Sequence, residues 1–133
     1  MSKEKNSNIT KLDFESIEPL LDFIPIGIIV FDQHFNIKSI NQTLLKFNLI
    51  NINFNNKLID LNLLEVNLFN DIKLKDELKS LSEYNFIEKE IKNLKRNDGS
   101  EISIILKATP IFENDEFLGG IIVIEDLNIT IDT

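Results

Sequence analysis

The sequence predicts an α+β fold, in which a five-stranded antiparallel sheet carries short helices over one face and is preceded by an N-terminal flanking helix. Two observations predict it: a β-hairpin pattern near the start of the chain, and three strand patterns joined by short turns near its end. Segments with helical spacing separate the two groups of strands. Because a hairpin and a meander each have an apolar face to bury, one continuous sheet closed by the intervening helices is the most economical arrangement.

The length of 133 residues fits one domain, and 43% hydrophobic with 27% charged residues is typical of a globular chain. The first residues are polar and charged and lead into no apolar run. We expect residues 1–12 to be disordered, residues 13–128 to form the single domain and residues 129–133 to be a C-terminal tail.

Residues 13–24 are predicted to form the flanking helix. Their apolar side chains recur at i, i+3, i+4 and i+7, the stripe of an amphipathic helix: Ile17, Leu20, Leu21 and Ile24. Ser16 can cap this helix, and Pro19 then falls in the first turn, where a missing N–H costs nothing. Pro25 disfavours helical backbone at the residue before it, so the helix ends there.

The first hairpin follows directly. GIIVFD (27–32) is a β-branched and aromatic run that predicts a strand, DQHFN predicts a turn, and NIKSI predicts a second strand. From Asn41 the spacing becomes helical, with Asn41 as the N-cap.

The middle of the chain is rich in asparagine and aspartate, which compete for backbone hydrogen bonds and end helices early. We therefore expect only short helical turns around residues 58–66. A fuller helix is predicted over 71–82, with its apolar side chains at Ile72, Leu74, Leu78 and Leu81.

The last part of the chain predicts three strands at 85–95, 101–112 and 117–127, joined by the polar turns RNDGS and ENDE. The last two strands are apolar on both faces, so the face away from the helices also needs a cover. We predict a homodimer that packs through the flanking helix and this outer face. Its interface residues are Ile17, Leu20, Leu21, Ile24, Ile105, Ile121 and Val123.

Composition excludes several classes of function. The absence of cysteine rules out disulfides, thiolate nucleophiles, cysteine-ligated zinc and iron–sulfur clusters. The net charge of −8 repels phosphate backbones, so we expect no nucleic-acid binding. No apolar run is long enough to span a bilayer and no signal peptide is seen, so we expect no membrane insertion and a cytoplasmic location.

Catalytic and metal sites are not predicted. The one histidine, His34, lies in the predicted hairpin turn two residues from Asp32, where an exposed turn residue is the simpler interpretation. Glu113, Asp115 and Glu116 lack the glycine-centred spacing of a calcium loop. A small enzyme is the weaker alternative.

Two stretches resemble a PAS domain. LLDFIPIGIIVFDQHFNIKSINQTLLKF is similar to the opening of that family, with matching residues Pro25, Gly27, Asp32, Ile37 and Asn41. KRNDGSEISIILKATPIFENDEFLGGIIVIEDL is similar to its ending: a basic residue and an Asp-Gly turn, a strand, a short loop, then glycine and a β-branched strand that ends in aspartate. Together the resemblance covers about residues 16–127.

The resemblance implies a non-catalytic sensory and dimerisation module, such as the input domain of a two-component histidine kinase or a transcription regulator. Haem-binding relatives usually present a histidine from the helix before the meander, and residues 71–82 contain none. Light-sensing flavin relatives need a cysteine, and redox flavin relatives often have a tryptophan; the chain has neither. We therefore expect no haem, cysteinyl-flavin or other cofactor.

An apolar metabolite in the space between sheet and helices is compatible with the resemblance, and so is a filled core in a ligand-free protein–protein interaction module. The candidate cavity residues are Val30, Leu44, Leu45, Leu61, Leu74, Leu78, Ile104, Leu106, Ile122 and Ile124. The end of the last strand resembles the Asp-Ile/Val-Thr triad that couples PAS domains to an effector. Here it reads Asp126-Leu127-Asn128, so Asp126 and Leu127 are the candidates for signal coupling to an effector domain or partner, and the third position departs from the pattern.

Overall fold

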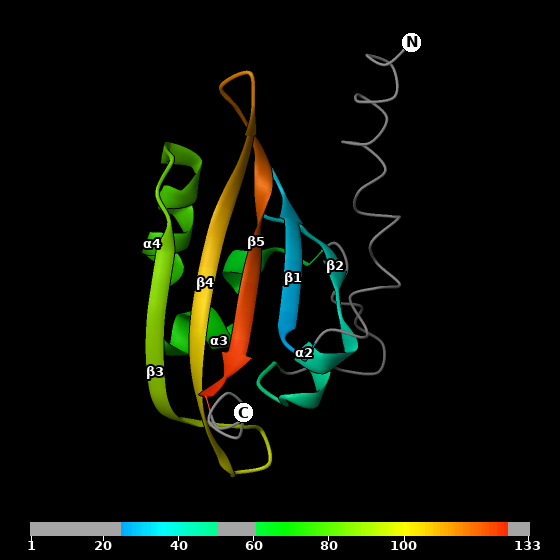
Figure 1. Ribbon diagram of the computed structural model, residues 1–133, viewed down its shortest axis with the longest axis vertical. Helices are drawn as coiled ribbons and strands as arrows, with labels where there is room; N and C mark the ends of the chain where they lie inside the picture. The colour runs from blue at the N-terminus through cyan, green and yellow to red at the C-terminus, as the bar shows by residue number, and fades with distance from the viewer. Residues whose placement is uncertain (1–24, 51–60, 128–133) are drawn as a thin grey trace.

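A single antiparallel sheet organises the chain. The computed structural model describes residues 25–50 and 61–127. The strands are β1 (Gly27–Asp32), β2 (Ile37–Ile40), β3 (Ile87–Lys95), β4 (Glu101–Glu113) and β5 (Glu116–Asp126). They form one five-stranded sheet in the order β2-β1-β5-β4-β3, and every neighbouring pair is antiparallel (Figure 1). The predicted fold class is confirmed.

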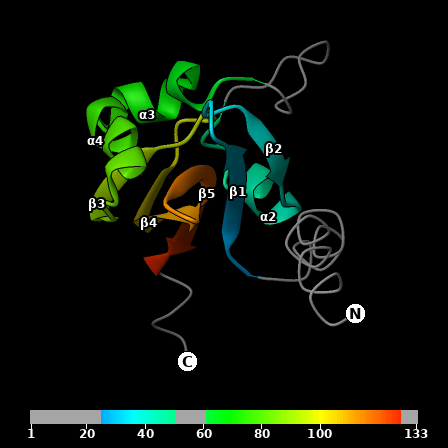
Figure 2. The same ribbon diagram turned by 90° about the horizontal axis from the view of Figure 1, so that it is seen from above.

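Short helical segments connect the two groups of strands. They are α2 (Gln42–Lys46), η1 (Leu63–Glu65), α3 (Asn67–Asp71), α4 (Lys75–Lys79) and η2 (Ser80–Glu83). Figure 2 shows that α3 and α4 lie on one side of the sheet. The flanking helix predicted at 13–24, the disorder predicted for 1–12 and the tail predicted at 129–133 lie outside the described residues.

The helix predicted over 71–82 was wrong in its extent. Lys73 has a left-handed backbone (φ 59°), and the Leu74 N–H donates to the Phe69 carbonyl, which ends α3. A separate helix, α4, then begins at Lys75. The break directs Leu74 into the core, where it is 2% exposed. Ile72 and Leu74 would lie on nearly opposite sides of one continuous helix, and the turn at Lys73 lets both contact the core.

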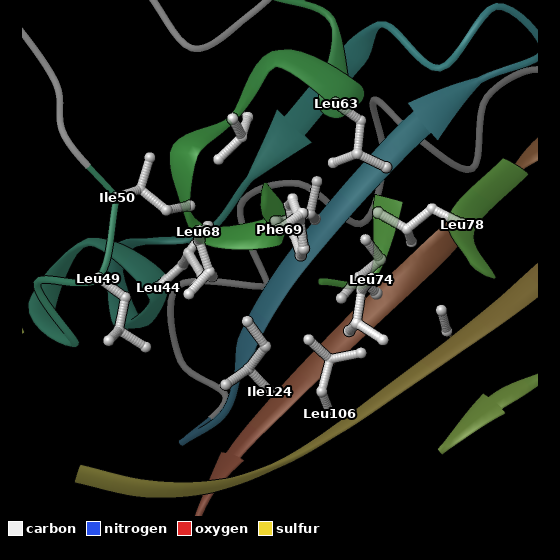
Figure 3. Close-up of a cluster of buried hydrophobic side chains, with 14 of the residues drawn as sticks. Leu44, Leu49, Ile50, Leu63, Leu68, Phe69, Leu74, Leu78, Leu106 and Ile124 are labelled. Carbon is white, nitrogen blue, oxygen red and sulfur yellow. The ribbon is translucent and has the colours of Figure 1, made fainter. Parts of the chain in front are cut away.

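The main core lies between the sheet and the helical segments. Figure 3 shows leucine, isoleucine and phenylalanine side chains from both layers meeting in one apolar cluster. Its buried members are Ile29, Phe31, Ile37, Leu44, Phe47, Leu49, Ile50, Leu63, Val66, Leu68, Phe69, Leu74, Leu78, Leu81, Ile87, Ile102, Ile104, Leu106, Ala108, Ile122 and Ile124. We call this set the inner cluster. Burial of aliphatic and aromatic side chains of this kind contributes roughly 1.5–3 kcal/mol each.

Two glycines permit the close approach of β5 to β1. Gly119 has φ +132°, and a side chain there would collide with the Phe31 carbonyl oxygen and the Asp32 backbone. A Cβ on Gly120 would lie 2.5 Å from the Phe31 ring and 2.6 Å from the Thr109 carbonyl oxygen. The GG pair in the sequence therefore marks a place where backbone and ring atoms occupy the position of a side chain.

Replacing Gly119 with alanine should lower the free energy of unfolding by about 2–4 kcal/mol, because the change adds both a steric clash and backbone strain. Gly99→Ala is the matched control, since Gly99 also has positive φ (+90°) but nothing lies within 4 Å of its Cβ position. That control should cost only about 1 kcal/mol. Urea denaturation measures both, and equal losses would contradict the close-packing interpretation.

Candidate functional site

Strand alternation divides the sheet into two faces. On β4, the inner cluster includes Ile104, Leu106 and Ala108, so Ile105 and Lys107 between them point to the other side. We call the side that carries the helices the inner face and the opposite side the outer face. A ligand site between sheet and helices would belong to the inner face, and an assembly site to the outer face.

Most candidate cavity residues lie in the inner cluster: Leu44, Leu74, Leu78, Ile104, Leu106, Ile122 and Ile124. Leu61 packs against it and is partly buried. Figure 3 shows side chains from this group, including Leu44, Leu74 and Leu106, directed into the cluster.

Two of the candidates are placed elsewhere, and the predictions for them were wrong. Val30 is buried in a second small cluster with Ile28, because the β1 register gives the inner positions to Ile29 and Phe31. Leu45 is 43% exposed, because the short helix α2 turns its neighbour Leu44 inward instead.

Several buried residues of the core are absent from the cavity residues that the sequence predicts. Examples with almost no exposure are Ile29, Phe31, Ile37, Leu63, Phe69, Leu81 and Ile102. The spacing of Ile102, Ile104 and Leu106 on β4 could have found Ile102, whereas β1 is apolar at every position from 28 to 31 and gives no such signal for Ile29 and Phe31. No such signal marks Leu63, since η1 is too short to show a period.

The inner cluster is chemically uniform. Within the described residues the buried polar side chains are those of Ser39 and Asn41, and neither belongs to this cluster. The described part of the inner face therefore offers dispersion contacts and apolar burial, and it would hold an apolar group rather than orient a polar one.

Asn41 joins the start of β1 to the start of α2. Its Oδ1 accepts hydrogen bonds from the Ile28 N–H (2.9 Å) and from the Leu44 N–H (3.2 Å), and its Nδ2 donates to the Ile26 carbonyl (2.6 Å). The side-chain amide thus acts as an additional peptide group beside β1 while it caps the helix. The predicted capping role is confirmed.

Asp32 and His34 do not form an acid–base pair. Asp32 Oδ1 accepts from the backbone N–H groups of His34 and Asn36, both at 2.9 Å, and its other oxygen lies 3.7 Å from Lys38 Nζ. The exposed His34 ring has its Nε2 3.3 Å from the Gln33 amide nitrogen. The aspartate therefore closes the β1–β2 turn through backbone contacts.

The acidic residues at the β4–β5 turn also have a structural explanation. Asn114 and Asp115 have positive φ (51° and 65°), as a tight two-residue hairpin requires. Tyr84 stacks on Phe112 with ring centroids 3.8 Å apart, and its hydroxyl donates to Asp115 Oδ1 at 3.1 Å. Partial desolvation, with this hydrogen bond and the negative charge of Asp115, raises the pKa of Tyr84.

No group of metal-ligating side chains is found in residues 25–50 and 61–127.

The outer face carries the described candidates for assembly. Ile105, Ile121 and Val123 are half-buried there, and Ile121 packs against the cluster of Ile28 and Val30. Ile17, Leu20, Leu21 and Ile24, which belong to the same predicted interface, lie outside the described residues.

The candidate coupling residues lie at the end of β5. Asp126 is the last residue of that strand, opposite Ile104, and Leu127 follows it; both are half-buried. Asp126 lies two residues after the inner-cluster residue Ile124 on the same strand. None of the helices in the part of the chain that the structure describes is long and apolar enough to cross a membrane.

Comparison with known proteins identifies the fold. No family model and no curated protein matches the sequence. Among solved structures, the PAS domain of BvgS from Bordetella pertussis is similar with a TM-score of 0.63 at 19% identity, covering 86% of each chain. The chain has the fold of a PAS domain.

Two further structures agree with this PAS fold. A PAS domain of a protein from Colwellia psychrerythraea gives a TM-score of 0.59 at 16% identity, covering 86% of this chain and 96% of that one. The phage VqmA–DPO complex gives a TM-score of 0.68 at 12% identity, covering 92% of this chain. The match spans only 56% of the phage VqmA chain, so the PAS fold corresponds to about half of that protein.

Replacing Asn41 with alanine should lower the free energy of unfolding by about 2–4 kcal/mol, because it leaves the Ile28 N–H and the Ile26 carbonyl without this partner. Asn70→Ala is the control, since Asn70 is an exposed asparagine on α3. Thermal or urea denaturation compares the two variants. A loss for Asn41→Ala no larger than for the control would show that the amide does not join β1 to α2.

Proposed function

We propose that the chain is a non-catalytic PAS sensory or regulatory domain of a signal-transduction protein, of the histidine-kinase or transcription-regulator type. The observation that carries the proposal is the five-stranded PAS-like sheet closed over an apolar inner cluster. The similar structures include the BvgS PAS domain and a Vibrio cholerae VqmA–ligand–DNA complex, which support a regulatory role. The turn role of Asp32 and the exposed position of His34 argue against catalysis by this pair. A cytoplasmic location is part of the same proposal.

The first candidate function is sensing of an apolar metabolite at the inner face, with no haem or flavin. The apolar character of the inner cluster supports it, and one similar structure is described as VqmA bound to DPO. The second candidate is a ligand-free protein–protein interaction module. Residues such as Ile104, Leu106 and Leu78 are 0% exposed, which favours a core filled by its own side chains.

We also propose that the domain acts as a homodimer through residues 16–24 and the outer-face residues Ile105, Ile121 and Val123. A similar structure, VqmA from Vibrio cholerae, is described as a dimer, with a TM-score of 0.65 at 18% identity. Asp126 and Leu127 would pass a signal from β5 to a downstream effector domain or partner. In this proposal the domain itself binds neither nucleic acid nor membrane.

Native mass spectrometry of protein purified without denaturation separates sensing from pure interaction. If the domain senses a metabolite, the spectrum should show a retained small molecule, and unfolding and refolding should remove it and lower Tm. A ligand at 100 times its Kd stabilises the fold by about 2.7 kcal/mol, so the shift is measurable. A spectrum of polypeptide mass alone, with an unchanged Tm after refolding, would favour the interaction module.

Deleting residues 1–24 tests the dimer. We expect the shortened chain to keep its far-UV circular dichroism and to sediment as a monomer, because the deletion removes four of the seven proposed interface residues. Sedimentation velocity of the full chain at tens of micromolar is the reference measurement. A full chain that is strictly monomeric at that concentration would refute the homodimer.

A further inference from the structure

Four residues on the outer face of β4 and β5 lie at the corners of a small rectangle, and apolar and charged side chains alternate around it. In the β4–β5 register, Ile105 lies opposite Glu125, and Lys107 lies opposite Val123. The two apolar residues therefore occupy one diagonal of the rectangle, and the two opposite charges occupy the other. We call these four residues the outer quartet.

The outer quartet is available for contact. Ile105, Val123 and Glu125 are half-buried and Lys107 is exposed. Ion pairs within the described residues join Lys38 to Asp32, Lys89 to Glu77 and Lys92 to Glu90. Neither Lys107 nor Glu125 takes part in any of these pairs, and Glu88, which lies opposite Lys107 on β3, makes no ion pair with it. Both charges can therefore reach charges on another subunit.

Two-fold symmetry restricts how two copies of this face can meet. In an isologous interface, if residue i contacts residue j of the partner, then j contacts i of the partner. When two sheets pack face to face, the dyad lies in the plane between them. It can run parallel to the strands, perpendicular to them, or along either diagonal of the rectangle. Each orientation pairs the quartet differently, so their electrostatic consequences can be compared.

Three of the four orientations are unfavourable. A dyad parallel or perpendicular to the strands places each charge against an apolar side chain, which desolvates the charge without a partner. A dyad along the Lys107–Glu125 diagonal places Lys107 against the partner's Lys107 and Glu125 against the partner's Glu125, and both contacts are repulsive. The remaining dyad runs along the Ile105–Val123 diagonal. It places each apolar residue against the same residue of the partner, and it forms two contacts per dimer between Lys107 and the partner's Glu125.

We infer that the second copy of this chain packs on the outer quartet with the dyad along the Ile105–Val123 diagonal. This inference rests on the proposed homodimer and adds its geometry and its polar contacts. Strand spacing of about 4.8 Å and a repeat of about 6.8 Å for alternate residues set the diagonal about 35° from the strands, so the two sheets cross at about 70°. That angle lies closer to orthogonal than to aligned sheet packing.

Charge reversal with complementation tests the contact. Lys107→Glu and Glu125→Lys should each raise the dimer Kd about tenfold or more, because each variant creates two like-charge contacts per dimer. An equimolar mixture of the two variants should form a heterodimer, since one subunit then carries two carboxylates and the other carries two ammonium groups at the contacts. Sedimentation velocity measures the Kd values, and native mass spectrometry with one ¹⁵N-labelled variant detects the mixed dimer.

Matched controls remove net charge and misfolding as explanations. Lys75→Glu and Glu83→Lys make the same charge changes at exposed residues of α4 and η2 and should leave the dimer Kd unchanged. Circular dichroism and Tm verify that each variant folds, and recovery on mixing itself requires folded variants. If both quartet variants dimerise as tightly as the wild type, or if the two variants remain monomeric when mixed, the inferred contact is wrong although the homodimer stands. A monomeric wild type would overturn the homodimer and the inference together.

Discussion

The pairing of β4 with β5 is the constraint on which the rest of the structure depends. Its register runs from Ile104 opposite Asp126 to Glu113 opposite Glu116, and it determines which residues face inward on the two long strands. A slip of one residue would move the inner residues to the outer face and destroy the core. β3 extends this pair on one side and β1 on the other, so both inherit the same division into faces.

The hairpins could be predicted from the sequence because their signals are local. Strand runs with β-branched residues, separated by NDG or END, require only short-range turn chemistry. The face of a short strand is a different problem, as Val30 shows. In the run IIV every residue is apolar, so no alternation marks the inner side, and only pairing with β5 places Val30 opposite Ile121 on the outer face.

The helical region shows a second limit of sequence reasoning. Periodicity over 71–82 predicts one helix, yet the chain turns at Lys73 and a new helix begins at Lys75. The turn lets Ile72 and Leu74 contact the same cluster, which two residues so spaced on one helix could not do. Several asparagines have structural roles. Asn48, Asn93 and Asn114 adopt left-handed backbone, and Asn41 and Asn62 cap helical segments. Asparagine tolerates that region better than most non-glycine residues, which suits Asn114 in the β4–β5 turn and Asn93 at the irregularity in the β3–β4 pairing.

Strand β5 is where the two candidate sites meet. Ile122 and Ile124 point into the inner cluster, and Ile121 and Val123 alternate with them on the outer face. A molecule held at the inner face and a second copy held at the outer face would therefore contact consecutive residues of one strand. A ligand can change assembly only if it binds two arrangements of this strand with different affinity. Gly119 and Gly120 lie against Phe31 near the start of β5, and Asp126 lies opposite Ile104 of β4 at its end, so the sheet holds both ends of the strand that the two candidate sites share.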